Sequence, residues 1–246
     1  MSDFIGFHTQ VTSDNLPDRD NLQMFMLPPD VMFDKTVNER IPIYKQAITK
    51  WKCAKATRKM FVHGSYCINL CNPQMASLNA TKNQLRFANE IGADGLVIHC
   101  GKSLKMAKSD AIKLFMDNVG NAIERATEKC PLIIETCVGA GTELFSKLED
   151  FEQMILTLVM SYGKKIGCCI DTAHVFSAGY NPKDFINRLS NQMRGTIRLI
   201  HWNNSKSTKG SHVDRHASLH EGLIDPKELI EVASWAIHFN IPLVIE

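Results

Sequence analysis

Short hydrophobic segments recur along the 246-residue chain, separated by longer stretches in which polar and apolar residues alternate with a helical period. Eight segments rich in β-branched and other apolar residues are predicted to be strands: residues 5–11, 22–27, 60–66, 95–101, 131–136, 165–171, 196–202 and 242–246. Most of these segments are apolar almost throughout. Such strands are typical of a parallel sheet that helices cover on its faces.

The stretches between the strands carry helix signals. One helical face is formed by Leu148, Phe151, Ile155 and Leu158. Gly163 then provides a stop, and Asp225 followed by Pro226 is a typical helix start, because Asp caps free amides and Pro suits the first helical position. Eight strand–helix units within about 250 residues predict a (β/α)8 TIM barrel, with residues 1–246 as a single domain. An open, doubly wound sheet is the alternative.

Composition narrows the class of protein only slightly. With 44% hydrophobic residues the chain can bury a full core, and a net charge of +2 neither indicates nor excludes a nucleic-acid partner. The N-terminus lacks a secretory signal, the eight cysteines form no CxxC pair, and no apolar run approaches the ~18 to 20 residues of a membrane span. We therefore expect a soluble, intracellular protein without a membrane partner, in which Cys100, Cys168 and Cys169 are buried free thiols.

Polar residues end the predicted strands. Six of them occupy such positions: His63, His99, Glu135, Asp171, His201 and Glu246. The first four are spaced by 36 residues each, one strand–helix unit, so in a barrel all six would converge on the C-terminal mouth. Singly, such a histidine is usually a core or surface residue and such a carboxylate a helix cap. Together they would be electrostatically costly unless a cation neutralised them, so the set predicts a metal site.

Two local pairs add further ligands. His174 follows Asp171 by three residues, and Asp214 precedes His216 by two, which allows both side chains to point to one side of an extended segment. Nine His, Asp and Glu residues without Cys suit a catalytic zinc site, with Mn²⁺ as a possible substitute.

The chain also resembles a known family. The segments FVHGSYCINL, GLVIHCG, LIIETCVGAGTEL, GCCIDTAHVFSAGY and IHWNNSKSTKGSHVDRHASLHEG resemble, in order and spacing, the endonuclease IV family of abasic-site DNA repair endonucleases. The resemblance covers the chain from about residue 60 to its end. The segments DTAH and DRHASL are similar to those of family members from large DNA viruses. It implies three zinc ions: one held by His63 and His99, with Glu135 bridging to a second held by Asp171, His201 and Glu246, and a third held by His174, Asp214 and His216.

The resemblance further implies a zinc-dependent phosphodiesterase that cuts double-stranded DNA 5′ to abasic sites and leaves a 3′-hydroxyl. The enzyme would also trim blocked 3′ ends. It would be a monomer with Glu135 and Glu246 as catalytic residues. Tyr66 matches the aromatic wedge of the family, although it would otherwise pack on the barrel rim. The cations expected to reach DNA phosphates are Lys102, Lys105, Lys206, Lys209 and Arg215, unless they are simply solvated. His8 matches a family histidine that is not a usual ligand.

The sequence departs from the family in two places. The segment PPDVMF lacks an arginine that commonly enters DNA, so we expect Met32 or Phe33 to act there as an apolar wedge. The sequence ends at Glu246 without the final helix, so we expect this ligand to be the least secure. Two alternatives stay open: a sugar isomerase or epimerase barrel with one or two metals, and a non-catalytic DNA-binding barrel.

Overall fold

Eight parallel strands close into a barrel in the computed structural model, which describes residues 3–11 and 16–246. The strands are β1 Ile5–His8, β2 Asn21–Phe25, β3 Lys59–His63, β4 Leu96–His99, β5 Leu132–Glu135, β6 Ile166–Asp171, β7 Ile197–His201 and β10 Leu243–Ile245. Their order around the barrel is β1-β10-β7-β6-β5-β4-β3-β2, so β1 closes the sheet by pairing with β10 and β2. The TIM barrel predicted from the sequence is confirmed, and the open sheet is excluded.

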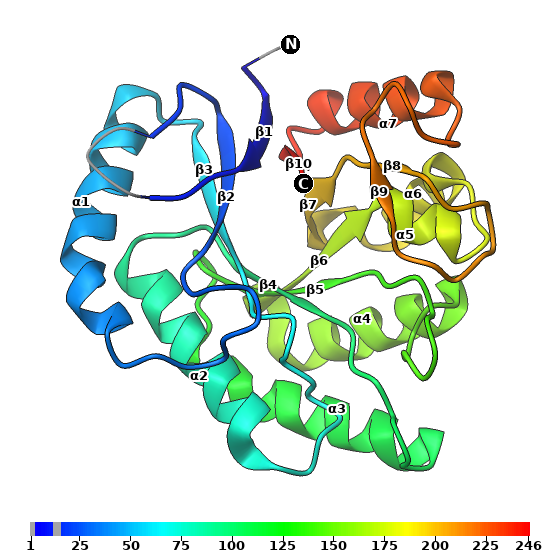
Figure 1. The fold of residues 1–246 in the computed structure, drawn as a ribbon, viewed down its shortest axis with the longest axis horizontal. Helices are drawn as coiled ribbons and strands as arrows, with labels where there is room; N and C mark the ends of the chain where they lie inside the picture. Colours follow the sequence, from blue (N-terminus) through cyan, green and yellow to red (C-terminus); the bar gives the residue numbers. More distant parts are fainter. Residues whose placement is uncertain (1–2, 12–15) are drawn as a thin grey trace.

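Helices lie around the outside of the barrel (Figure 1). They are α1 Val37–Ala54, α2 Met75–Glu90, α3 Lys108–Ala122, α4 Leu148–Tyr162, α5 Thr172–Ser177, α6 Pro182–Met193 and α7 Pro226–His238, with short 3-10 turns at Ile123–Arg125, Gly163–Lys165 and Arg194–Thr196. Both predicted helix signals are confirmed. Gly163 ends α4 with a φ of 58°, and the side chain of Asp225 caps α7 by accepting a hydrogen bond from the Lys227 amide at 2.8 Å. In the described ranges, no helix is both long and apolar enough to cross a membrane.

The barrel interior is filled by a small apolar cluster, distinct from the larger core between the sheet and the helices. The cluster consists of Phe61, Val97, Ile133, Cys169, Leu199 and Val244. Each of these residues stands two positions before one of the six strand-end polar residues. Side chains two apart on a strand point to the same side, so the apolar cluster forms a floor beneath the polar mouth.

All eight cysteines are free, as expected. Cys100, Cys168 and Cys169 are buried as predicted, whereas Cys53 and Cys67 are exposed. The six buried thiols therefore contribute to packing, and no group of possible metal ligands among the described residues includes a cysteine.

A two-stranded antiparallel ribbon follows the seventh barrel strand and was not predicted from the sequence. It pairs β8 Asn204–Ser205 with β9 His216–Ala217, and Ser205 lies opposite His216. The ribbon brings the segment that contains Asp214 and His216 back to the C-terminal mouth of the barrel.

Candidate metal centre

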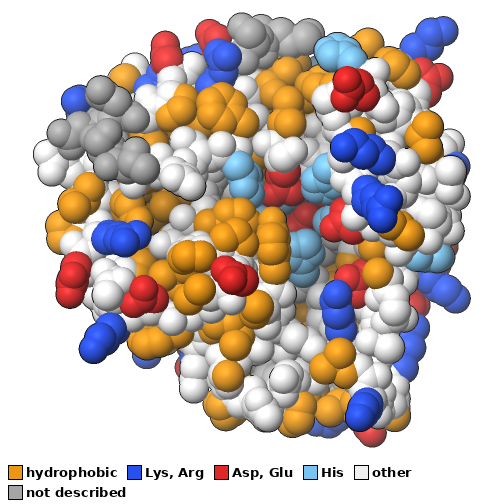
Figure 2. Space-filling model, in the orientation of Figure 1, with side chains coloured by type: hydrophobic (Ala, Val, Ile, Leu, Met, Phe, Trp, Pro, Cys, Tyr) orange, Lys and Arg blue, Asp and Glu red, His pale blue; other side chains and the backbone are white. Residues whose placement is uncertain are grey.

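The strand register brings six acidic and imidazole side chains to one level. His99 lies directly opposite Glu135 in the β4–β5 pair, and Asp171 lies directly opposite His201 in the β6–β7 pair. Figure 2 shows histidine and acidic side chains gathered in a hollow at the middle of this face of the molecule. The convergence of the strand ends, which the sequence spacing predicted, is present in the structure.

The remaining three predicted ligands reach the same hollow from outside the barrel strands. Asp171 caps α5 by accepting a hydrogen bond from the backbone amide of His174 at 2.9 Å, so the imidazole of His174 begins one helical turn above the strand end. Asp214 and His216 arrive on the β9 side of the ribbon. Two distances join the three residues: Asp214 Oδ2 is 3.2 Å from His174 Nε2, and Asp214 Oδ1 is 3.4 Å from His216 Nε2.

Three groups of possible ligand atoms form within this hollow. In each group every donor atom lies within 4.8 Å of every other. The groups are His63, His99 and Glu135; Glu135, Asp171, His201 and Glu246; and Asp171, His174 and His216. Glu135 and Asp171 each belong to two groups, so the three groups form one connected cluster.

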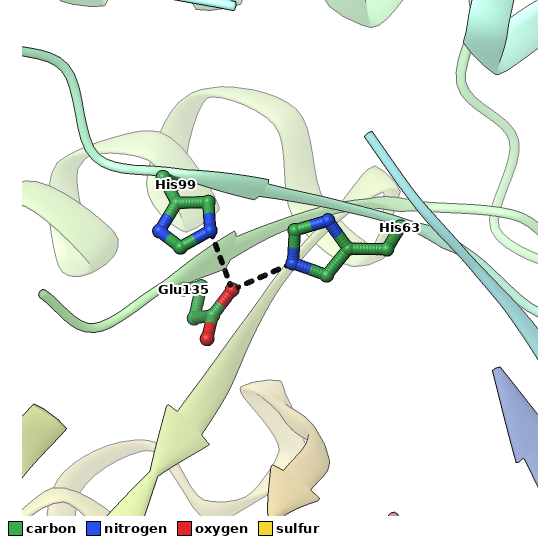
Figure 3. Close-up of side chains that lie close together, drawn as sticks. All are labelled: His63, His99 and Glu135. Atoms are coloured by element: carbon green, nitrogen blue, oxygen red, sulfur yellow. Dashed lines mark hydrogen bonds and ion pairs between the residues drawn. The ribbon is translucent and has the colours of Figure 1, made fainter. Parts of the chain in front are cut away.

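The first group is drawn in Figure 3. One carboxylate oxygen of Glu135, Oε2, lies 3.2 Å from His63 Nε2 and 3.7 Å from His99 Nε2. The Nδ1 atom of His63 donates to the Gly64 carbonyl at 2.7 Å, which turns Nε2 toward the carboxylate.

The second group centres on His201. Its Nδ1 atom lies 2.9 Å from Glu135 Oε1 and 3.2 Å from Glu246 Oε2. Glu246, the last residue of the chain, is also held by Gln23, whose Nε2 donates to its Oε1 at 2.8 Å, and by His8, whose Nε2 lies 2.8 Å from the same oxygen. Only 13% of the Glu246 side chain is exposed.

The donor atoms fit divalent metal ions. Three buried imidazole nitrogens, the Nε2 atoms of His99, His174 and His216, have no hydrogen-bond partner in the described part of the chain. Buried polar atoms are normally paired, so three unpartnered nitrogens that face carboxylates suit coordination of a cation. Imidazole nitrogen and carboxylate oxygen are the donors that catalytic zinc sites use.

The charge state of the cluster also suits a cation. Burial alone would raise the pKa of Glu135, but the nearby imidazoles of His201 and His99 hold it well below its usual range. Burial would likewise raise the pKa of Glu246, but the imidazoles of His201 and His8 hold it well below its usual range. Burial lowers the pKa of His99, so this imidazole is neutral and able to ligate. Ionised carboxylates and a neutral imidazole are the forms in which these side chains bind metals. Burial disfavours the charged forms of His174 and His201 as well, but Asp171 beside the first and Cys169 and Glu246 beside the second raise the pKa of each well above its usual range, so these two imidazoles would lose a proton on binding a metal.

Aromatic and apolar side chains line one side of the hollow (Figure 2). The ring of Tyr66 is 58% exposed and contacts His63 and His99 edge-on, with centroid distances of 5.4 and 5.6 Å. Burial and the Glu246 carboxylate raise the pKa of Tyr66 to about 12, so its hydroxyl stays protonated at neutral pH. Met32 packs against the hydrophobic core, whereas Phe33 is exposed.

Lysine and arginine side chains flank the hollow on its other side in Figure 2. All five cations predicted to contact DNA are exposed. Lys102 lines the metal cavity, but its Nζ lies 3.2 Å from Glu143 Oε1 and is therefore already paired. Lys206 and Arg215 are joined by a backbone hydrogen bond of 2.8 Å across the ribbon, while Lys209 Nζ donates to the Asn181 side chain. Lys105 lines a neighbouring cavity.

Two buried amides that sequence reasoning missed hold the cluster in place. Gln23 accepts a hydrogen bond from His201 Nε2 at 3.0 Å, besides its bond to Glu246 and a short contact with His8. Asn203 donates to Asp171 Oδ2 at 2.7 Å and accepts from the Glu246 amide at 2.9 Å. A polar residue inside the apolar strand 22–27 was the only sequence signal for Gln23.

Comparison with known proteins gives consistent findings. Residues 22–237 match the family described as xylose isomerase-like TIM barrel. A relative from Acanthamoeba polyphaga mimivirus, named as a putative endonuclease 4, is 30% identical over 243 residues, which are 91% of this chain and 76% of the relative.

Solved structures share the fold. Endonuclease IV from Thermus thermophilus superposes with a TM-score of 0.77 at 19% identity, over 98% of this chain and 91% of that chain. A D-tagatose 3-epimerase-like protein has a TM-score of 0.74 at 16% identity, over 98% and 88% of the two chains. The fold alone therefore accommodates both nuclease and epimerase relatives.

Proposed function

Because the chain belongs to the endonuclease IV family, within the xylose isomerase-like TIM barrels, we propose that it is a DNA repair endonuclease. It hydrolyses the phosphodiester 5′ to abasic sites in double-stranded DNA, leaves a 3′-hydroxyl and trims blocked 3′ ends. The observation that carries the proposal is the connected cluster of three donor groups, which share Glu135 and Asp171 at the barrel mouth.

Three Zn²⁺ ions are the proposed cofactors, with Mn²⁺ as a possible substitute. The proposed ligands of the first ion are His63 and His99, and those of the second are Asp171, His201 and Glu246, with Glu135 bridging the two. The third ion takes His174, Asp214 and His216. Bound divalent ions supply Lewis-acid stabilisation of the phosphate oxygens and lower the pKa of water.

The residues of the chain prepare the hollow for this chemistry. Glu135 is 1% exposed and remains ionised beside four imidazoles, so it would bind metal without first losing a proton. Its Oε2 faces His63 and His99, whereas its Oε1 faces His201, so the two oxygens are already divided between two donor groups. The apolar floor below excludes water from the inner side and leaves the outward face as the approach for DNA.

DNA would be bound by the two flanks of the hollow. Tyr66 presents an exposed, uncharged ring beside the donor cluster and is the proposed wedge into the base stack. Phe33, which is exposed, is favoured over Met32 as the apolar residue in the preceding loop. Lys206 and Arg215, whose backbones pair across the β8–β9 ribbon, are the proposed phosphate contacts.

The proposal is tested with a duplex that carries one tetrahydrofuran abasic analogue. We expect a single cut 5′ to the analogue, which persists after brief treatment with EDTA and disappears after prolonged zinc stripping. Re-addition of Zn²⁺ should restore cutting. Absence of any cut by the zinc-loaded chain would refute the proposed activity.

Metal analysis and binding assays on the same zinc-loaded chain distinguish the nuclease from the two alternatives, an epimerase and a non-catalytic DNA-binding barrel. A content of one metal ion per chain, together with turnover of a ketose, would indicate an epimerase. Tight binding of abasic DNA by the zinc-loaded chain without incision would indicate a non-catalytic DNA-binding barrel. The third donor group, which holds Asp171 beside His174 and His216, favours the nuclease over a site with one or two metals. The proposed ligand Asp214 lies outside that group but close to both imidazoles, at 3.2 Å from His174 and 3.4 Å from His216.

A further inference from the structure

Leu104 has an unusual backbone conformation for a leucine. It lies in the loop between β4 and α3 with a φ of 53°, and 59% of its surface is exposed. The left-handed region is occupied mainly by glycine, and by asparagine or aspartate among other residues, because a Cβ atom there comes too close to the following carbonyl oxygen. An exposed leucine in this conformation benefits neither from an unstrained backbone nor from burial.

The neighbouring loop holds Leu104 in this conformation. The Leu104 amide donates to Thr142 Oγ1 at 3.0 Å, and the Ser103 amide donates to the Thr142 carbonyl at 2.9 Å. A bridge between Lys102 and Glu143 joins the same two loops. Because these contacts fix the backbone independently of the leucine side chain, a glycine at position 104 would satisfy them equally well.

The side chain of Leu104 stands at the edge of the metal hollow. It lines the cavity of about 480 Å³ that also contains His99, His174 and His216. It lines as well an adjacent, mainly apolar cavity of about 720 Å³, and Asn72 is the other residue common to both. Leu104 therefore forms a ridge between the metal hollow and a second groove.

We infer that Leu104 is a specificity residue for the proposed substrate and packs against the unstacked abasic deoxyribose when the scissile phosphate lies at the donor cluster. This inference rests on the proposed function. A sugar without a base exposes apolar C–H groups, and an aliphatic side chain beside the ligands can cover them. A nucleotide that keeps its base in the stack presents no such surface at the ridge. Strain that the fold itself does not need is typical of a ligand-contacting position.

The experiment compares two duplexes that differ only at the lesion. One carries a tetrahydrofuran analogue and the other an intact base pair, and in both a methylene group replaces the bridging oxygen that would become the 3′-hydroxyl, so that neither is cut. Dissociation constants for the zinc-loaded chain are measured by fluorescence anisotropy. Leu104→Gly should raise the dissociation constant of the abasic duplex by about tenfold or more, as expected for loss of one buried leucine. The dissociation constant of the intact duplex should stay nearly unchanged.

Stability measurements separate a binding role from a structural one. Because glycine relieves the strain at φ 53°, the thermal midpoint of Leu104→Gly should equal or exceed that of the wild type. Leu104→Met, which keeps an aliphatic side chain, should retain most of the abasic preference. Met160→Ala removes a side chain that is 85% exposed on α4, away from both cavities, and should change neither constant.

Two results would overturn the inference: an unchanged affinity of Leu104→Gly for the abasic duplex, or an equal loss of affinity for both duplexes. Failure of the proposed function gives a different result, because the wild type itself would then show no preference for the abasic duplex.

Discussion

Replacing Gln23 by leucine tests whether the buried amides control metal binding. Gln23 is fully buried in β2, and its two amide atoms contact two proposed ligands: Oε1 lies 3.0 Å from His201 Nε2, and Nε2 lies 2.8 Å from Glu246 Oε1. Leucine has a similar volume but neither a donor nor an acceptor, so the substitution removes both bonds without opening a large cavity.

The amide also determines which nitrogen of His201 carries a hydrogen. An amide oxygen only accepts, so His201 Nε2 must be the donor in their shared bond. The other nitrogen, Nδ1, then faces Glu135 and Glu246 and is the atom available to a metal ion. Loss of Gln23 frees the imidazole to rotate or to change tautomer, and either event weakens the second donor group.

The expected magnitude follows from these contacts. Removal of an outer partner of a metal ligand typically costs about 10- to 100-fold in metal affinity, or about 1.4 to 2.8 kcal/mol. The buried Nε2–H of His201 is also left without an acceptor, which costs the apo fold about 1 to 3 kcal/mol. We therefore expect weaker zinc binding at the second donor group and a thermal midpoint lower by roughly 2 to 12 °C.

The zinc affinity is measured by titrating the metal-free chain with zinc in competition with a chromophoric chelator. Circular dichroism measures the thermal midpoint. Gln84→Leu is the matched control, because Gln84 is equally a buried glutamine with two hydrogen bonds, to the Ser65 amide and the Met32 carbonyl, and neither bond involves a proposed ligand. The control should lose stability but retain zinc affinity. Equal zinc affinities in both variants would refute the positioning role of Gln23.

Four further outcomes are expected. Glu135→Ala should lose the two bridged ions, measured by mass spectrometry of bound metal, together with incision; full turnover would contradict the ligand assignment. Tyr66→Ala should raise KM for abasic DNA about tenfold with a smaller change in kcat, in steady-state assays, because one stacking contact contributes about 1 to 3 kcal/mol. Cys53 and Cys67 should react with a disulfide reagent well before the six buried thiols. Burial raises the pKa of several of these, such as Cys130, to about 12, which leaves little reactive thiolate. Asp225→Ala should lower the free energy of unfolding by about 1 kcal/mol, measured by urea denaturation, because it removes the cap of α7.

The strand pattern predicted the barrel and the position of the donor cluster for the same physical reason. An apolar residue such as Ile133 or Val97 must point into the barrel, and the residue two positions later, Glu135 or His99, must point the same way at the mouth. A polar residue at that place cannot be satisfied by the apolar floor, so the pattern itself identifies candidates for a site.

Contacts between segments far apart in the chain were not predictable in this way. The pairing of Lys102 with Glu143 depends on how two loops meet, and it reduces the freedom of a cation expected to bind DNA. The ribbon that carries His216 to Asp171 consists of two-residue strands, too short for a periodic signal. The left-handed conformation of Leu104 arises from Thr142 on another loop, so no residue near Leu104 in sequence indicates it.

Glu246 shows why such distant contacts decide the strength of the site. A carboxylate at the last residue of a chain was expected to be loosely held, because terminal residues fray unless other groups fix them. In the structure the β10 strand is paired on both sides, the Glu246 amide donates to Asn203, and its carboxylate lies against Gln23, His8 and His201. These contacts come from three other strands and a loop, so the position of Glu246 depends on closure of the barrel rather than on the final residues themselves. The Gln23→Leu variant removes one of these contacts directly, and its effect on zinc affinity therefore also measures how firmly the barrel holds its last ligand.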